Sequence, residues 1–328
     1  MKTYLKSSFI LIIMLFLVVL TACSVVDTGS DSQSNSARSV EKNKSDQKLK
    51  IGLTLGTLSN PFFVSMSKGA KEATKEMGAE LITVSADYDL AKQTSQIEDF
   101  ITKEVDLILL NAVDSKGIAA AVQQAKSAGI PVIAVDVAAE GGVDSVVTSD
   151  NYQAGKIAGE YMIKQLKGKG NIAIIEGPPV SAVTDRINGF EEAIKKSEIK
   201  VIAKQNGEGN REKALTATEN ILQAHSKGSI DAIFAINDPE ALGVKIAQEQ
   251  AEREKEFFIV GVDGAPEAVE ALKEKKSLTA TSAQHPDEMM KKALEIGKDV
   301  LDGKKVDKLV KVPVELVTQE NVNNYKGW

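Results

Sequence analysis

The sequence has few residues of the kinds that bind metals or form disulfides. Of its 328 residues, one is a cysteine, Cys23, and two are histidines, His225 and His285. With a single cysteine, no internal disulfide, thiol nucleophile or cysteine metal cluster is available. The two histidines lack metal-ligand spacing, and we expect both to be ordinary helix-end or loop residues.

The sequence also lacks the loop motifs of nucleotide-binding proteins and of common hydrolases. The first predicted strand is followed by LGTLSNPFF rather than G-x-G-x-x-G, and neither G-x-x-x-x-G-K-[ST] nor G-x-S-x-G occurs. Gly207-Glu208-Gly209 is predicted to be a turn at a strand end. Charges of both signs are mixed and sum to −6, with no Lys/Arg block interleaved with aromatic residues. These absences argue against an enzyme, a cofactor and a nucleic-acid partner.

The N-terminal residues predict secretion and lipid attachment. Two lysines precede an apolar run that is shorter than the ~20 residues a spanning helix needs, which disfavours a transmembrane anchor. The run ends in LTAC, a lipobox whose Cys23 we expect to be acylated. We therefore predict a signal peptide over 1–22 and a disordered tether, with the lipidated cysteine, over 23–48. Such a protein is extracytoplasmic and anchored in the cell membrane.

From Leu49 onward, strand and helix patterns alternate. Short apolar runs rich in Ile, Val and Leu predict strands buried on both faces, the pattern of a parallel sheet between helices. We expect strands at 48–55, 80–84, 105–110, 131–135 and 144–149, and then at 171–175, 201–205, 232–236, 257–262, 278–283 and 311–317. The restart predicts an α/β fold with two similar halves. We expect the chain to cross between them near Ser149–Asn151, Gln284 and Val312.

Five of the predicted strands end on a hydrogen-bonding side chain. These side chains belong to Asn111, Asp136, Asn237, Asp263 and Gln284. In open α/β sheets, ligands bind in the crevice beyond the carboxyl ends of the strands. The pattern therefore indicates a site for a polar small molecule.

Eight motifs follow one another along the chain. They are TLSNPFFVSMSKGAKEA (57–73), LLNAVDS (109–115), VIAVD (132–136), SDNYQAGKIAGEY (149–161), RINGF (186–190), FAINDPEALG (234–243), VGVDGAPE (260–267) and ATSAQHPDE (280–288). In this order they resemble the ribose-binding members of the type I periplasmic binding protein family. The resemblance implies two Rossmann-like lobes with parallel sheets, joined by a three-segment hinge. It places the N-terminal lobe at 49–150 plus 285–311 and the C-terminal lobe at 151–284 plus 312–328.

The resemblance implies that eight residues touch the ligand, and each suits a sugar. They are Asn60, Phe62, Phe63, Asn111, Asp136, Asn237, Asp263 and Gln284. Phenylalanine rings present flat apolar faces to the C–H surface of a sugar, amides donate and accept, and aspartates are charged acceptors for hydroxyl groups. Taken singly, Asn60 has an alternative interpretation as a helix N-cap, Phe62 as a core residue and Asp263 as a turn former.

Three positions depart from the ribose-binding pattern. That pattern has an arginine where this chain has Val137, a second arginine where it has Thr184, and a phenylalanine where it has Gly209. The site therefore loses two cations and one aromatic wall, and we expect Arg186 to replace one cation in part. The ligand stays open among another pentose, a ketohexose such as fructose, or a polyol.

The function implied by the resemblance is capture of a neutral sugar and its delivery to an ABC importer, with the permease and its ATPase as partners. We expect the protein to be a monomer. The alternative is a sugar-sensing component that reports to a chemoreceptor or histidine kinase. A transcription repressor shares the lobes but needs an N-terminal helix-turn-helix, where this chain has a lipobox and tether. An enzyme is disfavoured because no nucleophile, base and oxyanion set is found.

Overall fold

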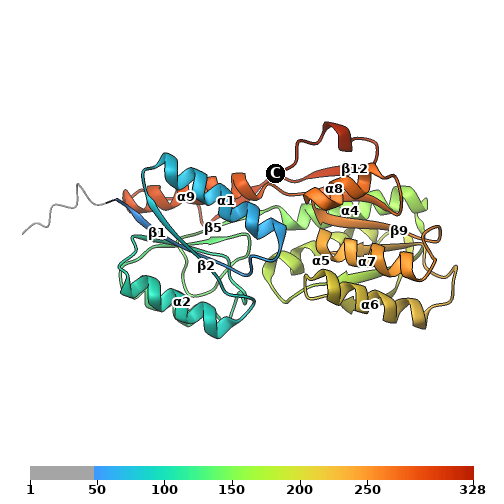
Figure 1. The fold of residues 1–328 in the computed structure, drawn as a ribbon, viewed down its shortest axis with the longest axis horizontal. Helices are drawn as coiled ribbons and strands as arrows, with labels where there is room; N and C mark the ends of the chain where they lie inside the picture. The colour runs from blue at the N-terminus through green and yellow to red at the C-terminus, as the bar shows by residue number, and fades with distance from the viewer. Residues whose placement is uncertain (1–47) are drawn as a thin grey trace, which may run out of the picture. The chain divides into compact units, whose positions relative to one another are not determined.

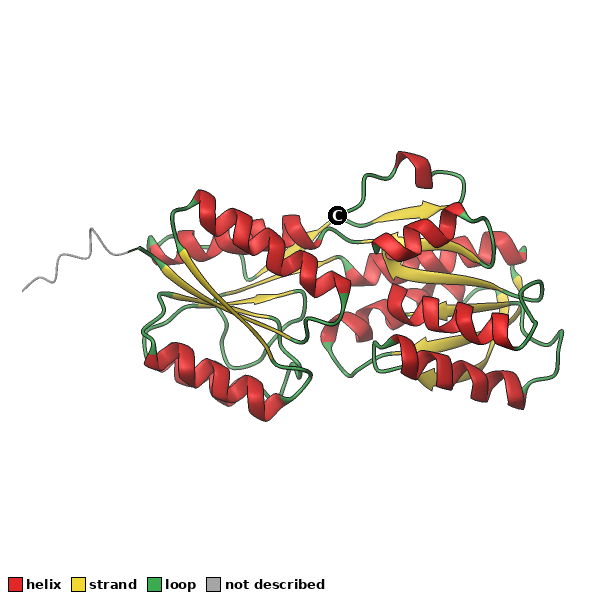
Figure 2. Ribbon diagram, viewed as in Figure 1, coloured by secondary structure: helices red, strands yellow, loops and turns green. Residues whose placement is uncertain are grey.

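The computed structural model describes residues 48–328 and contains two six-stranded sheets (Figures 1 and 2). Cys23, the predicted signal peptide and nearly all of the predicted tether lie outside these residues. The first sheet has the order β11-β5-β4-β3-β1-β2 and is parallel throughout. Its strands are β1 (Lys50–Leu55), β2 (Glu80–Ser85), β3 (Leu107–Leu110), β4 (Val132–Val135), β5 (Ser145–Ser149) and β11 (Leu309–Val312).

The second sheet has the order β12-β10-β9-β8-β6-β7. Its strands are β6 (Lys169–Glu176), β7 (Glu198–Asn206), β8 (Ala232–Ala235), β9 (Phe258–Asp263), β10 (Leu278–Ala283) and β12 (Glu315–Thr318). All neighbouring pairs are parallel except β10 with β12. The two orders correspond strand by strand, so that β3 matches β8 and β4 matches β9. The predicted α/β fold with two similar halves is therefore confirmed.

Helices cover both faces of each sheet (Figure 2). On the first sheet, α1 (Pro61–Glu76) and α9 (Pro286–Leu301) pack on one face, and α2 (Leu90–Thr102) and α3 (Ala119–Ser127) on the other. On the second sheet, α4 (Asn151–Leu166) and α5 (Ser181–Ile194) pack on one face, and α6 (Arg211–Ala224), α7 (Asp238–Gln250) and α8 (Pro266–Lys273) on the other. We call each sheet with its helices a lobe, the first containing β1 and the second β6.

The central strands are short and wholly apolar because helices bury both of their faces. Every residue of β3 and of β4 is buried, as is every residue of β8. A parallel strand in this position cannot alternate polar and apolar side chains. The first polar residue after each run therefore marks the point where the strand leaves the core.

The chain passes between the sheets three times: after β5, after β10, and between β11 and β12. The predicted final strand over 311–317 is wrong as a single element, because Val312 pairs in the first sheet and Glu315 in the second. Pro313 lies between them, and proline has no backbone N–H with which to continue a ladder. The Asp150 N–H donates to the Val312 carbonyl oxygen (2.9 Å), so the first and third crossings lie side by side.

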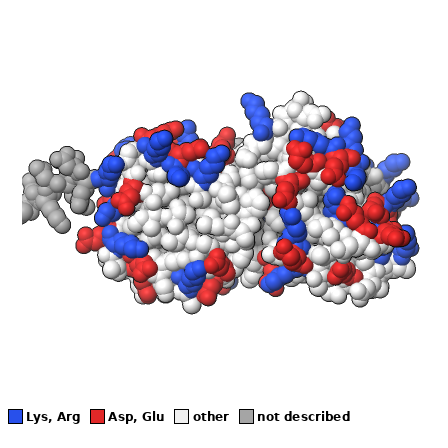
Figure 3. All heavy atoms as spheres, viewed as in Figure 1, with Lys and Arg blue, Asp and Glu red and all other residues white. Residues whose placement is uncertain are grey.

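Between residues 48 and 328, no helix has the length and apolar character needed to cross a membrane. Over the same range, no group of three or more His, Cys, Asp or Glu side chains is placed to hold a metal ion. On the face drawn in Figure 3, basic and acidic side chains lie intermixed.

Candidate ligand-binding site

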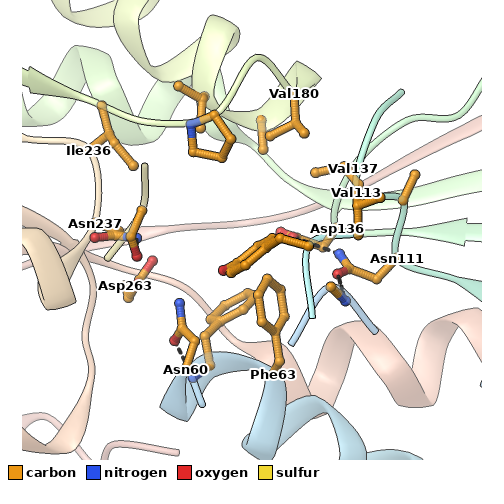
Figure 4. Close-up of a pocket in the computed structure, with 18 of the residues that line it drawn as sticks. Asn60, Phe63, Asn111, Val113, Asp136, Val137, Val180, Ile236, Asn237 and Asp263 are labelled. Carbon is orange, nitrogen blue, oxygen red and sulfur yellow. Dashed lines mark hydrogen bonds between the residues drawn. The ribbon is translucent and has the colours of Figure 1, made fainter. Parts of the chain in front are cut away.

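A pocket lies at the carboxyl ends of the strands and is lined by residues of both lobes (Figure 4). It contains about 600 Å³ of space between protein atoms, part of it open to solvent. The structure brings all nine sequence-predicted residues together here. The lining includes Asn60, Phe62, Phe63, Asn111, Asp136, Arg186, Asn237, Asp263 and Gln284.

In the first lobe, Asn111 and Asp136 form a buried pair at the ends of β3 and β4. The Asn111 amide donates from Nδ2 to Asp136 Oδ2 (3.1 Å), and its Oδ1 accepts from the Gly56 N–H (2.9 Å). Asp136 Oδ1 is buried without a hydrogen-bond partner among the described residues. Burial raises the pKa of Asp136 to about 6, against the opposing effects of Arg186 and the Asn111 hydrogen bond. This oxygen is an acceptor available to a bound hydroxyl group.

In the second lobe, Asp263 lies between an amide and a guanidinium. Gln284 donates from Nε2 to Asp263 Oδ1 (2.7 Å), and Arg186 Nη1 lies 3.6 Å from the same oxygen. Burial raises the pKa of Asp263 to about 7, while Arg186 and Gln284 lower it. Gln284 Oε1, also buried, has no partner among residues 48–328. The second lobe therefore adds a further free acceptor next to its carboxylate.

Arg186 reaches the pocket because α4 and α5 pack unusually closely. A Cβ atom on Gly155 of α4 would lie 1.8 Å from the Arg186 carbonyl oxygen, so only glycine permits this approach. The side chain is 6% exposed. It donates from Nε to Asn151 Oδ1 (2.8 Å) and from Nη1 to the Ile236 carbonyl oxygen (2.9 Å). These contacts fix a buried cation beside Asp263.

The start of α1 combines helix capping with the pocket lining. Asn60 Oδ1 accepts from the Phe62 N–H (2.9 Å), so Asn60 is the predicted N-cap and also lines the pocket. Phe62 is 4% exposed and belongs to the first-lobe core, yet its ring borders the pocket as well. Phe62 and Phe63 meet edge to face, with centroids 5.6 Å apart. Asn60 is therefore a helix cap and Phe62 a core residue, and both also line the pocket.

Asn237 is likewise both cap and lining residue. Its Oδ1 accepts from the Glu240 N–H (2.9 Å), which caps α7, and its Nδ2 donates to the Gly209 carbonyl oxygen (3.1 Å). Gly209 follows the end of β7 with φ 69°, in the predicted turn, and lines the pocket itself. Both polar atoms of Asn237 are engaged within the protein, so it is less available to a ligand than Gln284, whose Oε1 has no partner among the described residues.

Tyr88 is a pocket residue that the strand-end pattern did not reveal. It lies in the loop between β2 and α2 with φ 58°, and its N–H donates to the Gly56 carbonyl oxygen (2.8 Å). A Cβ on Gly56 would lie 3.4 Å from the Tyr88 ring and 3.2 Å from Asn111 Oδ1. Tyr88 is 44% exposed, although burial and nearby carboxylates raise the pKa of its hydroxyl to about 12. The only sequence signal was its place beyond the carboxyl end of a parallel strand.

One side of the pocket is aliphatic, a second feature that the sequence pattern did not reveal. The lining includes Ala112, Val113, Val137, Pro178, Val180, Ala182, Val183 and Ile236. Val137 packs in one cluster with Val180 and Ala182, which come from the other lobe. In Figure 4, Val113, Val137 and Val180 lie across the pocket from Asn60 and Phe63. Thr184 is outside the lining and donates to the Val180 carbonyl oxygen (3.2 Å).

Comparisons with known proteins agree on one family. The model of the family described as "Periplasmic binding protein domain" matches residues 51–305. The ribose import binding protein RbsB of Bacillus subtilis (strain 168) is 39% identical over 317 residues, covering 96% of this chain and all of that protein. That relative is named as a binding protein for ribose import.

Solved structures give the same result. An ABC transporter periplasmic solute binding protein from Actinobacillus succinogenes with bound D-allose has a TM-score of 0.79 and 32% identity, covering 85% of this chain and 100% of that one. An ABC transporter solute binding protein from Mycobacterium smegmatis with bound glycerol has a TM-score of 0.81 and 31% identity, covering 86% and 98%. These likenesses confirm the predicted fold and the prediction of a binding protein rather than an enzyme.

Proposed function

We propose that this chain, which belongs to the periplasmic binding protein family, is the solute-binding component of an ABC importer and captures a neutral sugar or polyol. The observation that supports this most strongly is the pocket at the strand ends, where both lobes supply buried hydrogen-bonding groups. The lobe limits that we propose are 49–150 plus 285–311 and 151–284 plus 312–328. The ligand would be bound between them.

The charges around the pocket favour a neutral ligand rich in hydroxyl groups. Asp136 and Asp263 line it together with a single arginine, Arg186, and the buried Glu240 lies close behind. An anionic ligand such as a sugar phosphate would add negative charge to a site where burial already raises the pKa of its carboxyl groups. Hydroxyl groups, in contrast, donate well to carboxylate and amide oxygens. We therefore expect sugar phosphates to be rejected.

The apolar lining narrows the choice among neutral ligands. Phe62, Phe63 and Tyr88 are the aromatic residues of the lining, and all come from the first lobe. The ribose-binding pattern has a phenylalanine where this chain has Gly209 of the second lobe. Tyr88 would supply an aromatic face in its place, from the first lobe. Val137, in place of an arginine, presents an apolar surface to the pocket. This lining favours a ligand with an apolar face, and we keep another pentose, a ketohexose and a polyol as the candidates.

Contacts between the lobes support a mechanism in which they close on the ligand. The Ala138 N–H of the first lobe donates to Ser181 Oγ of the second (2.8 Å), and the Ser181 N–H donates to Ser115 Oγ (3.4 Å). A ligand shifts an open–closed equilibrium only by its different affinities for the two states. Because the proposed ligand contacts come from both lobes, they exist together only in the closed state.

We further propose that the protein acts outside the cytoplasm as a monomer, anchored through lipidated Cys23. Among its solved relatives, the protein from A. succinogenes is named as periplasmic. The partners would be the permease and its ATPase. Labelling with palmitate, and its loss in Cys23→Ala, tests the anchor; wild-type protein recovered only as an unlipidated soluble species would contradict it.

A thermal-shift screen tests the ligand class. Ribose, allose, fructose, xylitol and glycerol would be compared with ribose 5-phosphate. A ligand at a hundred times its Kd stabilises the folded state by about 2.7 kcal/mol. Stabilisation by at least one neutral compound and none by the phosphate is expected. No response to any sugar or polyol, together with tight binding of a nucleotide, would overturn the proposal.

Tyr88 offers a sharper test of the proposed site. Tyr88→Ala removes the aromatic face and should weaken binding about tenfold, whereas Tyr88→Phe keeps the face and should retain most of the affinity. Tyr152, also exposed but on α4 and outside the pocket lining, supplies the matched control Tyr152→Ala. Equal affinity in Tyr88→Ala and wild type would remove Tyr88 from the site.

A further inference from the structure

Asp263, whose carboxylate we propose to bind the ligand, lies in a turn at the end of β9. The backbone of this turn has an unfavourable conformation. Asp263 has φ 133° and the next residue, Gly264, has φ 74°. A positive φ is unfavourable for a residue with a side chain and persists only where surrounding contacts hold it. A Cβ on Gly264 would lie 2.7 Å from the Ala283 Cβ, so the turn is also tightly enclosed. The contacts that hold this turn therefore bear directly on the site.

Two aromatic side chains from far along the sequence donate to the carbonyl groups of this turn. Trp328 Nε1 donates to the Asp263 carbonyl oxygen (3.0 Å), which also accepts from the Gln284 N–H (2.8 Å). The Tyr325 hydroxyl donates to the Gly264 carbonyl oxygen (3.4 Å). Burial is the main cause that raises the pKa of Tyr325, and the negative charge of Asp238 raises it further. The Tyr325 hydroxyl therefore keeps its proton. Both donors are thus present throughout the physiological pH range.

Trp328 also contacts the other lobe. Its ring meets Phe62 edge to face, with centroids 6.0 Å apart and planes at 86°. Phe62 in turn meets Phe63, and both line the pocket. Trp328 is partly buried against the cores of both lobes. It therefore touches one proposed binding residue of each lobe, although neither Trp328 nor Tyr325 lines the pocket.

We propose that Trp328 and Tyr325 are positioning residues of the ligand site, which hold the Asp263–Gly264 turn in its binding geometry, and that Trp328 couples this turn to Phe62 in the opposite lobe. The inference rests on the proposed function, since it assigns these residues a role in sugar binding. They act on the ligand only through Asp263 and Phe62. Their removal should therefore weaken binding without removing any contact to the ligand.

Conservative variants separate positioning from general stability. Tyr325→Phe and Trp328→Phe each remove one hydrogen bond to the turn, and Trp328→Ala also removes the contact with Phe62. Tyr161→Phe is the matched control, because the Tyr161 hydroxyl donates to the Thr279 carbonyl oxygen (3.3 Å) in the same lobe, outside the pocket lining. Calorimetric titrations with fructose, allose and xylitol should show a roughly two- to tenfold loss of affinity for the two phenylalanine variants. Trp328→Ala should lose more, and Tyr161→Phe should bind like wild type.

Two readouts remain informative if a variant misfolds or the ligand class is wrong. Trp328 is the only tryptophan of the chain, so its emission should change when wild-type protein is saturated with ligand. Amide exchange at Gly264 and Ala265 should be faster in Tyr325→Phe and Trp328→Phe than in Tyr161→Phe, with no ligand present. Exchange unaltered in both variants, or affinity losses equal to that of Tyr161→Phe, would overturn the inference. Absence of binding to every sugar would instead overturn the proposed function. In that case the exchange result alone would decide whether Trp328 and Tyr325 hold the Asp263–Gly264 turn.

Discussion

The two lobes place corresponding residues at the site but hold them in different ways. Asn111 and Asp136 stand at the ends of β3 and β4, as Asn237 and Asp263 do at the ends of β8 and β9. In the first lobe the asparagine donates to the aspartate (3.1 Å). In the second lobe no such bond is found, and Asp263 is held by Gln284 (2.7 Å) with Arg186 nearby.

The helix that follows each asparagine explains the difference. α7 begins at Asp238, directly after Asn237, so the Asn237 oxygen is used as the N-cap. A loop separates Asn111 from α3, which begins at Ala119, so Asn111 is free to hold its neighbouring carboxylate. Equivalent strand ends therefore give one lobe an amide–carboxylate pair and the other a network in which an arginine lies beside the carboxylate. The consequences of removing single residues should differ accordingly.

The largest effect is expected where the charged network is broken. Arg186→Ala removes a buried cation, leaves the Asn151 and Ile236 oxygens without their donor, and places Asp263 in an uncompensated site. Loss of one partner of a buried ion pair costs about 3–5 kcal/mol. Chemical denaturation should show a loss of unfolding free energy of this size, and ligand titration should show weakened binding as well.

Arg253→Ala is the matched control, because Arg253 is an equally buried arginine of the second lobe. It pairs with Glu256 (2.6 Å) and donates to the carbonyl oxygens of Leu222 and His225 (2.9 Å each), outside the pocket lining. This variant should lose stability but keep its ligand affinity. If both variants lose affinity equally, Arg186 has no particular role in the site.

The next effect compares the two aspartates. Asp136→Ala and Asp263→Ala each remove a charged acceptor whose hydrogen bonds contribute about 1.5–3 kcal/mol, so affinity should fall roughly ten- to a hundredfold. Asp136→Ala should leave the melting temperature nearly unchanged, whereas Asp263→Ala should lower it because Arg186 loses its counterion. The control is Asp106→Ala, which removes an acceptor for the Lys50 N–H at the opposite end of the first sheet. Wild-type affinity in both site variants would show that the strand-end site is wrong.

The strand ends were predictable because their chemistry is local. A buried parallel strand must be apolar on both faces, so the first hydrogen-bonding residue after each run, such as Asn111 or Asp136, marks the edge of the sheet. The residues at the start of α1 came instead from the family resemblance, since a lone asparagine before Pro61 indicates only an N-cap. The roles of these residues in binding stay predictions until ligands are tested.

The features that sequence did not predict depend on contacts between distant segments. Tyr88 enters the pocket through a loop with positive φ, and Val180 and Ala182 reach it only because the second lobe packs against Val137. The strand predicted over 311–317 looked continuous because its apolar residues alternate across Pro313. Only pairing with different sheets shows that it is two strands.

The stability of the unliganded protein and its affinity for the ligand should change with pH in opposite directions. Burial raises the pKa of Asp136 to about 6 and that of Asp263 to about 7, above the ordinary value of 3.8. The folded protein then binds more protons than the unfolded chain, so the stability from these groups is full below about pH 4 and is lost as pH rises through 6 to 7. Ligand hydroxyl groups donate better to the ionised carboxylates. Affinity should therefore rise severalfold between pH 5.5 and pH 8, while the unliganded protein loses stability.

Melting curves and titrations at the two pH values test this opposition. Asp136→Asn, which cannot ionise, should flatten both slopes in part, and the remaining slope should report Asp263. The comparison of the lobes predicts that the remaining midpoint lies at the higher pH. An affinity independent of pH in wild type would show that the ligand does not bind to the ionised carboxylates.

The smallest effect is expected for a substitution of Asn60, which both caps α1 and lines the pocket. Asn60→Ser keeps a capping oxygen for α1, so the unfolding free energy should change by only a few tenths of a kcal/mol. The shorter side chain withdraws the amide from the pocket, and affinity should fall severalfold. Asn210→Ser is the control, because Asn210 caps α6 through the Glu212 N–H (2.9 Å) but does not line the pocket. Titration of both variants should therefore show a loss only for Asn60→Ser, and an equal, unchanged affinity would reduce Asn60 to a helix cap.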